Sequence, residues 1–160
     1  MSKLHRAKWD ERASAAVNAR RELPRLAASY FARVRALLAR DPSPPNLHRL
    51  RLATKRLRYT LELFRPCYGP GLETRLAALR RIQQSLGDVN DSTAAIRLFS
   101  NSMSPASPQR ARVLRFLEQR AAVKAQQFRK DWTEVFDAPG RERWWTAYLA
   151  RHARAPRRRP

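Results

Sequence analysis

The segment from His48 to Glu62 carries side chains that bind phosphate or orient groups that do, at steps of three and four residues. They are His48, Arg51, Lys55, Arg58, Tyr59 and Glu62, a set that we call the basic strip. Residues at these spacings share one face of a helix, and the helical rise extends that face over about 20 Å. Guanidinium and ammonium groups bind phosphate oxygens strongly, yet neighbouring cations repel each other. The pattern therefore indicates either a solvated charged face or a prepared site for a linear polyanion.

The opposite side of the same segment is apolar and must hold the basic strip in place. Its members are Leu50, Ala53, Leu57, Leu61 and Phe64. Asn46 is a good N-cap residue, so we expect a helix over 46–65. His48 would then lie in its first turn, where backbone N–H groups and the helix dipole attract an anion. Tyr59 adds a neutral hydroxyl donor, and Glu62 can hold Arg58 or Lys55 extended.

Proline and glycine divide the rest of the chain into helix-length segments. Breaks fall at 41–45, 66–71, 100–108 and 139–140. Between them we predict helices over 13–40, 72–99 and 109–137, and a short one around Trp144-Trp145 that caps the end of the bundle. Gly87 is expected to stop the third helix in the left-handed conformation, with Asp88 or Asn90 capping a new helical segment after it. In the fourth, helical spacing puts Phe128, Trp132 and Val135 on one side.

These segments predict an all-α fold, an antiparallel four-helix bundle with a short C-terminal helix and a basic tail. We expect one domain over residues 1–150 and a disordered basic tail over 151–160. The formal net charge is +21, from 34 Lys and Arg against 13 Asp and Glu. Such a field concentrates polyanions. A GC-rich genome also enriches Arg, so we rely on the net charge rather than on the Arg content.

The sequence lacks the residues that several classes of protein function require. The three histidines are far apart and Cys67 is the only cysteine, so we expect neither a metal site nor a disulfide. Glycine-rich cofactor loops and clustered catalytic carboxylates are absent from the sequence, so we expect no cofactor and no enzyme activity. The polar, basic N-terminus and the lack of a long apolar run predict a cytoplasmic protein that does not enter a membrane.

Two motifs resemble a known family. His48 to Tyr59 reads HRLRLATKRLRY and is similar to the HxxRxxxKRLRY signature of CHAD domains, the conserved-histidine α-helical family. Leu79 to Asp91 is similar to the family's LxxLQxxLGDxND element, and the resemblance covers about residues 12–137. It implies helical bundles that bind inorganic polyphosphate without catalysis, and association with polyphosphate granules. By position, the binding residues would be His48, Arg51, Lys55, Arg56, Arg58, Tyr59, Arg80 and Arg81, although Arg56 projects about 100° away from the basic strip.

A full family domain usually pairs two such bundles, whereas this chain resembles the C-terminal one alone. Leu52 and Leu63 fall near Tyr59 on the polar side of the helix, where exposed apolar residues suggest an interface. We therefore expect a homodimer that restores the two-bundle arrangement. The alternative function is that of a nucleic-acid-binding basic protein that also uses Arg157 to Arg159. Polyphosphate binding should weaken with salt and strengthen as pH falls through about 6.5, where histidine gains its proton.

Overall fold

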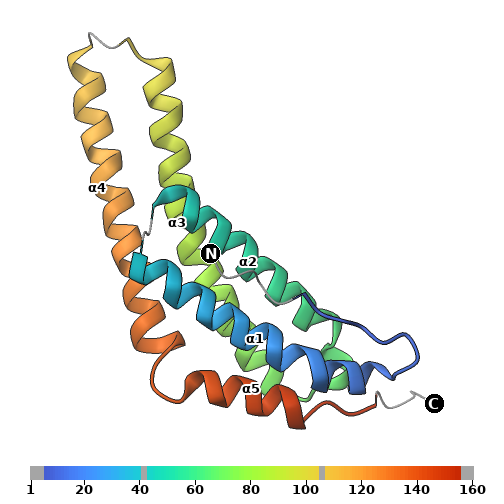
Figure 1. The fold of residues 1–160 in the computed structure, drawn as a ribbon. Coiled ribbons are helices and arrows are strands. Elements are labelled where there is room, and N and C mark those ends of the chain that lie inside the picture. Colours follow the sequence, from blue (N-terminus) through green and yellow to red (C-terminus); the bar gives the residue numbers. More distant parts are fainter. Residues whose placement is uncertain (1–5, 41–42, 105–106, 156–160) are drawn as a thin grey trace.

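The computed structural model describes residues 6–40, 43–104 and 107–155 and builds them almost entirely from helices (Figure 1). The helices are α1 (Ala15–Arg40), α2 (Pro44–Leu63), α3 (Gly71–Ser102), α4 (Pro108–Lys130) and α5 (Arg141–Arg151). A 3-10 turn, η1 (Arg65–Cys67), follows α2, and a π-helical turn, η2 (Asp131–Phe136), continues α4. No strand occurs within the described ranges, so the all-α prediction is confirmed. The finer arrangement, an antiparallel four-helix bundle, stays a prediction.

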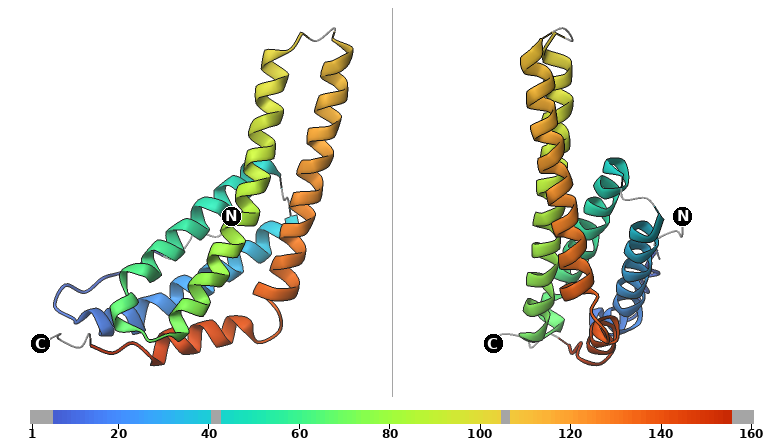
Figure 2. Two further views of the ribbon diagram at one scale, coloured as in Figure 1. Left: turned by 180° about the vertical axis from the view of Figure 1, so that it is seen from behind. Right: turned by 90° about the vertical axis from the view of Figure 1, so that its left-hand side faces the viewer.

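The helices form two layers that overlap over part of their length. α3 and α4 make a long hairpin, and its far half projects beyond the other helices (Figure 1). α1 and α2 lie side by side against its near half, and α5 packs along α1 (Figure 2). The projecting half is less buried, with Leu98 and Phe116 at least 60% exposed. The core therefore lies in the near half, where α1 packs on α2 and α5, and α2 packs on α3.

Aromatic side chains fill the core between α1, η2 and α5. Phe31 of α1 contacts Trp132, Phe136 and Trp145, with ring centroids 5.2 to 6.2 Å apart. Tyr30 is fully buried, and its hydroxyl lies 2.8 Å from Thr54 Oγ1 on α2. In the π turn the Asp137 N–H donates to the Trp132 carbonyl at 2.8 Å, five residues back. The wider turn stacks the Trp132 and Phe136 rings at 4.7 Å. It also explains a wrong prediction, because the extra residue per turn leaves Val135 48% exposed and buries Phe136 instead.

The predicted helix around Trp144 and Trp145 is confirmed as α5, which docks on the start of α3 through Arg75. The Arg75 side chain is buried, and its guanidinium lies 3.4 Å from the Trp144 ring and 3.8 Å from the Tyr148 ring. It donates to the carbonyls of Gly71 and Trp144 at 2.9 and 2.7 Å. Burial lowers the pKa of Arg75 to about 10. Two rings and two carbonyls thus replace the carboxylate that a buried arginine usually has.

Two expectations about helix ends are wrong. Gly87 does not stop α3, which continues through it to Ser102, and among the described glycines only Gly140 has a positive φ. One helical glycine costs about 1 kcal/mol, which a long helix packed on two sides tolerates. Asn46 is not the N-cap of α2 either, since Ser43 precedes a first turn that begins with Pro44 and Pro45. Proline suits this turn because its fixed φ is helical and its missing N–H would have no partner there.

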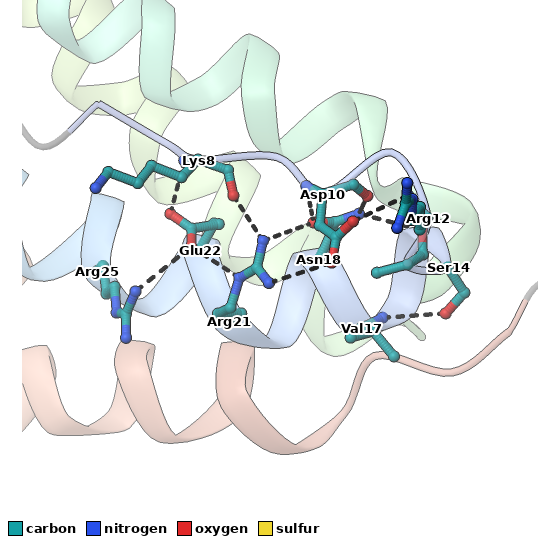
Figure 3. A network of polar contacts seen from close by, with 10 residues as sticks. Lys8, Asp10, Arg12, Ser14, Val17, Asn18, Arg21, Glu22 and Arg25 are labelled. Atoms are coloured by element: carbon teal, nitrogen blue, oxygen red, sulfur yellow. Dashed lines mark hydrogen bonds and ion pairs between the residues drawn. The ribbon is translucent and has the colours of Figure 1, made fainter.

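Residues outside the helices are tied to α1 and η1. The Lys8 N–H donates to Glu22, and Arg21 reaches the Lys8 carbonyl at 2.6 Å, so the segment before α1 lies along that helix (Figure 3). After α5, Ala153 is buried and the Arg154 N–H donates to the Cys67 carbonyl at 2.8 Å. Residues 156–160 of the expected tail, Arg157 to Arg159 included, lie outside the described residues.

Candidate functional site

The basic strip lies where α2 meets α3. Side chains on α2 meet residues of α3 that are also three or four positions apart, and the numbers fall on α3 as they rise on α2. The two helices therefore run in opposite directions here. In order along α2, the pairs are His48 with Asn90, Arg51 with Gly87, Arg58 with Gln83, and Glu62 with Arg80.

His48 stands at the α2 N-terminal end of the strip, held by α3. Its Nδ1 lies 2.8 Å from the Asn90 amide oxygen. Because that oxygen only accepts, Nδ1 carries the hydrogen and Nε2 is left for a ligand. The imidazole is exposed and, with Arg49 and Arg97, lines a pocket of about 530 Å³. Since α2 begins at Pro44, His48 lies in the second turn and not in the first turn that the sequence predicted.

Arg51 and Lys55 provide positive charge that no carboxylate neutralises within the described residues. Neither side chain forms an ion pair there, and the buried Nε of Arg51 has no hydrogen-bond partner. An orphaned donor of this kind costs about 1–3 kcal/mol. Gly87 of α3 lies beside this Nε, because a Cβ at residue 87 would be 3.9 Å from it, in ordinary van der Waals contact. The centre of the basic strip is thus cationic and lacks an acceptor.

Arg58 is a partnered cation. It donates to Glu62 at 2.6 Å and to Gln83 at 2.9 Å, and its guanidinium lies 4.2 Å from the Tyr59 ring. Only 14% of the Arg58 side chain is exposed, whereas Tyr59 is 49% exposed. These contacts fix the guanidinium in one orientation. They also place the one carboxylate of the basic strip at its far end, away from Arg51 and Lys55.

The remaining three residues expected to bind polyphosphate lie on different faces of α2 and α3. Arg80 lies at the Glu62 end, 3.6 Å from that carboxylate, and so adjoins the basic strip. Arg56 is exposed on α2, and its guanidinium pairs with no described residue. Arg81 points to another side of α3 and lines a pocket with Asp131 and Trp145. The structure therefore brings Arg80 to the basic strip and separates Arg81 from it.

Sequence reasoning missed the α3 residues that orient the strip. Asn90 and Gln83 position His48 and Arg58, and Arg97 joins the pocket beside His48. The sequence contained a signal for these residues, because positions 80, 83, 87 and 90 are three or four residues apart and so share one face of α3, as the basic strip does on α2. Asp88, expected to act as a cap, instead pairs with Lys124 of α4 at 3.0 Å and ties the hairpin together.

We also searched the described residues for metal-binding clusters and for membrane-spanning helices. In residues 6–40, 43–104 and 107–155, no three His, Cys, Asp or Glu side chains gather where a metal ion could be held. None of the helices described is both long enough and apolar enough to span a membrane.

Comparison with known protein families gives a match that covers more than half of the chain. The family model described as CHAD domain matches residues 2–100. This range includes α1, α2, both motifs and nearly all of α3, and it ends before α4. Neither a curated protein nor a solved structure matches the chain.

Proposed function

The chain belongs to the CHAD domain family, and on that premise we propose that it binds inorganic polyphosphate along the basic strip, without catalysis. One observation carries the proposal more than any other. Arg51 and Lys55 form the centre of a continuous cationic face in which the buried Arg51 Nε has no described acceptor. A phosphate bound by the outer nitrogens of Arg51 and by the Lys55 ammonium would neutralise the repulsion between the two cations.

A linear polyanion suits this face better than a single phosphate. From His48 to Glu62 the helical rise gives a length of about 20 Å, with possible donors at each step. His48 and Arg58 are held by Asn90 and Gln83, so little side-chain freedom is lost when a ligand arrives. Successive phosphates would contact His48, Arg51, Lys55 and Tyr59, with Arg58 and Arg80 near the acidic end. Arg81 is not part of this proposed set.

The alternative is nucleic-acid binding through the same net charge and Arg157 to Arg159. Labelled long-chain polyphosphate, competed with RNA and with duplex DNA at equal phosphate concentration, separates the two functions. We expect polyphosphate to compete at least about tenfold better than either nucleic acid. Replacing Arg157, Arg158 and Arg159 together by Gln should leave polyphosphate affinity within about threefold. Equal competition by RNA, or loss of binding on replacing these three arginines, supports the nucleic-acid function instead.

A second copy of the chain is the protein partner that we propose. Leu52 and Leu63 of α2 are 50% and 79% exposed, and Tyr59 lies between them in sequence. Two copies of net charge +21 repel each other, so a polyanion between them should favour pairing. Light scattering at high micromolar concentration should show a dimer when polyphosphate is present. A monomer both with and without polyphosphate would exclude the homodimer and leave the polyphosphate proposal intact.

A further inference from the structure

A second pocket lies on the side of α3 where Arg81 points. It has a volume of about 400 Å³ and is formed by α3, η2 and the start of α5. Its volume falls in the range of pockets that bind small organic molecules, about 300–1,000 Å³. Its residues are separate from the basic strip, because Arg80 and Arg81 are adjacent on α3 and project about 100° apart.

The base of this pocket is apolar and fixed by packing. Ile82, Phe136 and Trp145 are each at least 97% buried and belong to the core. The Phe136 and Trp145 rings are 5.3 Å apart, and both also contact Phe31. These side chains are held rigidly but expose only 1–3% of their surface, so the accessible apolar surface of the pocket also depends on Val135, which is 48% exposed.

The lining also carries two guanidinium groups without a carboxylate partner among the described residues. The Arg81 guanidinium forms no ion pair or hydrogen bond there. Arg141 donates to the Val135 carbonyl at 3.3 Å and lies 4.8 Å from the Trp144 ring. The nearby carboxylate of Asp131 is occupied by Gln127 at 2.8 Å and Ser85 at 3.3 Å. Asp131 keeps its negative charge, so the two arginines and this carboxylate leave the lining of the pocket with a net charge of +1 above an apolar base.

The π turn contributes directly to this pocket. Asp131, Val135 and Phe136 all belong to η2 and all line it. Single π turns within α-helices occur frequently at functional sites. Here the turn buries Phe136 as part of the base and leaves Val135 exposed.

We propose that this pocket binds a small amphipathic organic anion, a flat apolar body carrying one carboxylate or phosphate. The body lies against Val135, above Phe136 and Trp145, and Arg81 and Arg141 bind the head group. Polyphosphate has no apolar part, so it gains nothing from this base. The site is independent of the basic strip and does not rest on the proposed function.

Calorimetric titration with 2-naphthoate tests the proposal, in about 0.3 M salt to screen nonspecific attraction to the net charge. We expect one saturable site. Acetate lacks the apolar body and 2-naphthalenemethanol lacks the charge, so each should bind at least about tenfold more weakly. Arg81→Gln should weaken 2-naphthoate binding about tenfold. Arg143→Gln, an equal charge change at an exposed α5 position outside the pocket, should change it less than about twofold.

Three results would overturn the proposal: no saturable binding of 2-naphthoate up to about 5 mM, equal binding of the neutral alcohol, or equal effects of Arg81→Gln and Arg143→Gln. Circular dichroism and thermal unfolding of both variants check that the fold is intact. Since Arg81 is exposed and pairs with no described carboxylate, its substitution should not lower stability.

Discussion

The Arg51 side chain lies over Gly87, with its Nε 3.9 Å from the position that a Cβ at residue 87 would take. At this ordinary van der Waals distance a methyl group at position 87 of the continuous helix is tolerated, whereas a longer side chain would meet Arg51. Without a side chain at 87, the Arg51 guanidinium can lie along α3 while its Nε stays buried and unpartnered. Gly87 thus shapes the surface of the proposed polyphosphate site.

Substitutions at Gly87 should separate helix stability from binding. A distance of 3.9 Å is ordinary van der Waals contact, so Gly87→Ala fits and should raise the free energy of unfolding by about 0.5–1 kcal/mol. Its polyphosphate affinity should stay within about threefold of the parent. Gly87→Leu should displace Arg51 and lower the affinity at least about tenfold. Urea unfolding and polyphosphate titration measure the two effects, and equal affinities for the Ala and Leu variants would contradict this role of Gly87.

Protonation of His48 should couple polyphosphate binding to pH. Asn90 occupies Nδ1, so a proton added at Nε2 creates a cationic donor facing the ligand. The other polar groups that line its pocket are Arg49, Arg97, Thr93 and Asn90, and none of them is a carboxylate. Affinity should therefore rise as pH falls from about 8 to about 5.5, by about three- to tenfold.

His48→Gln keeps a polar side chain without the titration and should remove most of this rise. His152→Gln is the matched control, because His152 stacks on Tyr148 away from the basic strip. Affinity measured at several pH values compares the three proteins. An identical pH dependence in wild type and His48→Gln would assign the effect to the ligand's own phosphates.

The buried pair of Tyr30 and Thr54 should show coupled effects on stability. Their oxygens are 2.8 Å apart, and Thr54 also donates to the Leu50 carbonyl, so the Tyr30 hydroxyl is the donor. Burial raises the pKa of Tyr30, which keeps that proton in place. Thr54→Val leaves the hydroxyl buried without an acceptor and should cost about 1–3 kcal/mol. Tyr30→Phe combined with Thr54→Val should cost less than the sum of the single variants in urea unfolding, and simple additivity would argue against the hydrogen bond.

Cys67 should react slowly in the folded protein. It is 5% exposed in η1, and burial raises the pKa of its thiol, so little of the reactive thiolate forms near pH 8. Alkylation by iodoacetamide should be at least about tenfold slower than in the denatured chain. Mass spectrometry with and without guanidinium measures the ratio. Equal rates would mean that the segment around Cys67, including its hydrogen bond to Arg154, opens readily.

Periodicity along α2 predicted both of its faces correctly. Leu50, Leu57 and Leu61 are buried as expected, and the basic strip is on the other side, because long-range packing reinforces the local pattern there. The predictions of helix ends failed where the propensity of a single residue competed with packing or with neighbouring prolines. Gly87 and Asn46 have the propensities of a helix stop and a helix cap, but α3 packing and the two prolines at 44–45 determine the structure.

Which helix faces which neighbour could not be predicted from the pattern of one helix. Arg80 and Arg81 are adjacent in sequence, yet only Arg80 adjoins the basic strip, because α3 lies between α2 on one side and η2 on another. The π turn was equally hidden, since the spacing of Phe128 and Trp132 continues smoothly to Val135 in an ordinary α-helix. Both features depend on how distant segments pack.

The most direct test of the polyphosphate site compares two double variants of equal charge change. Arg51→Gln with Lys55→Gln alters the centre of the basic strip, and Arg112→Gln with Lys130→Gln alters two exposed cations of α4. We predict that the first lowers polyphosphate affinity by about 100-fold and flattens its salt dependence, while the second changes affinity less than about threefold. Similar losses in both double variants would mean that net charge, and not the basic strip, binds the polyanion.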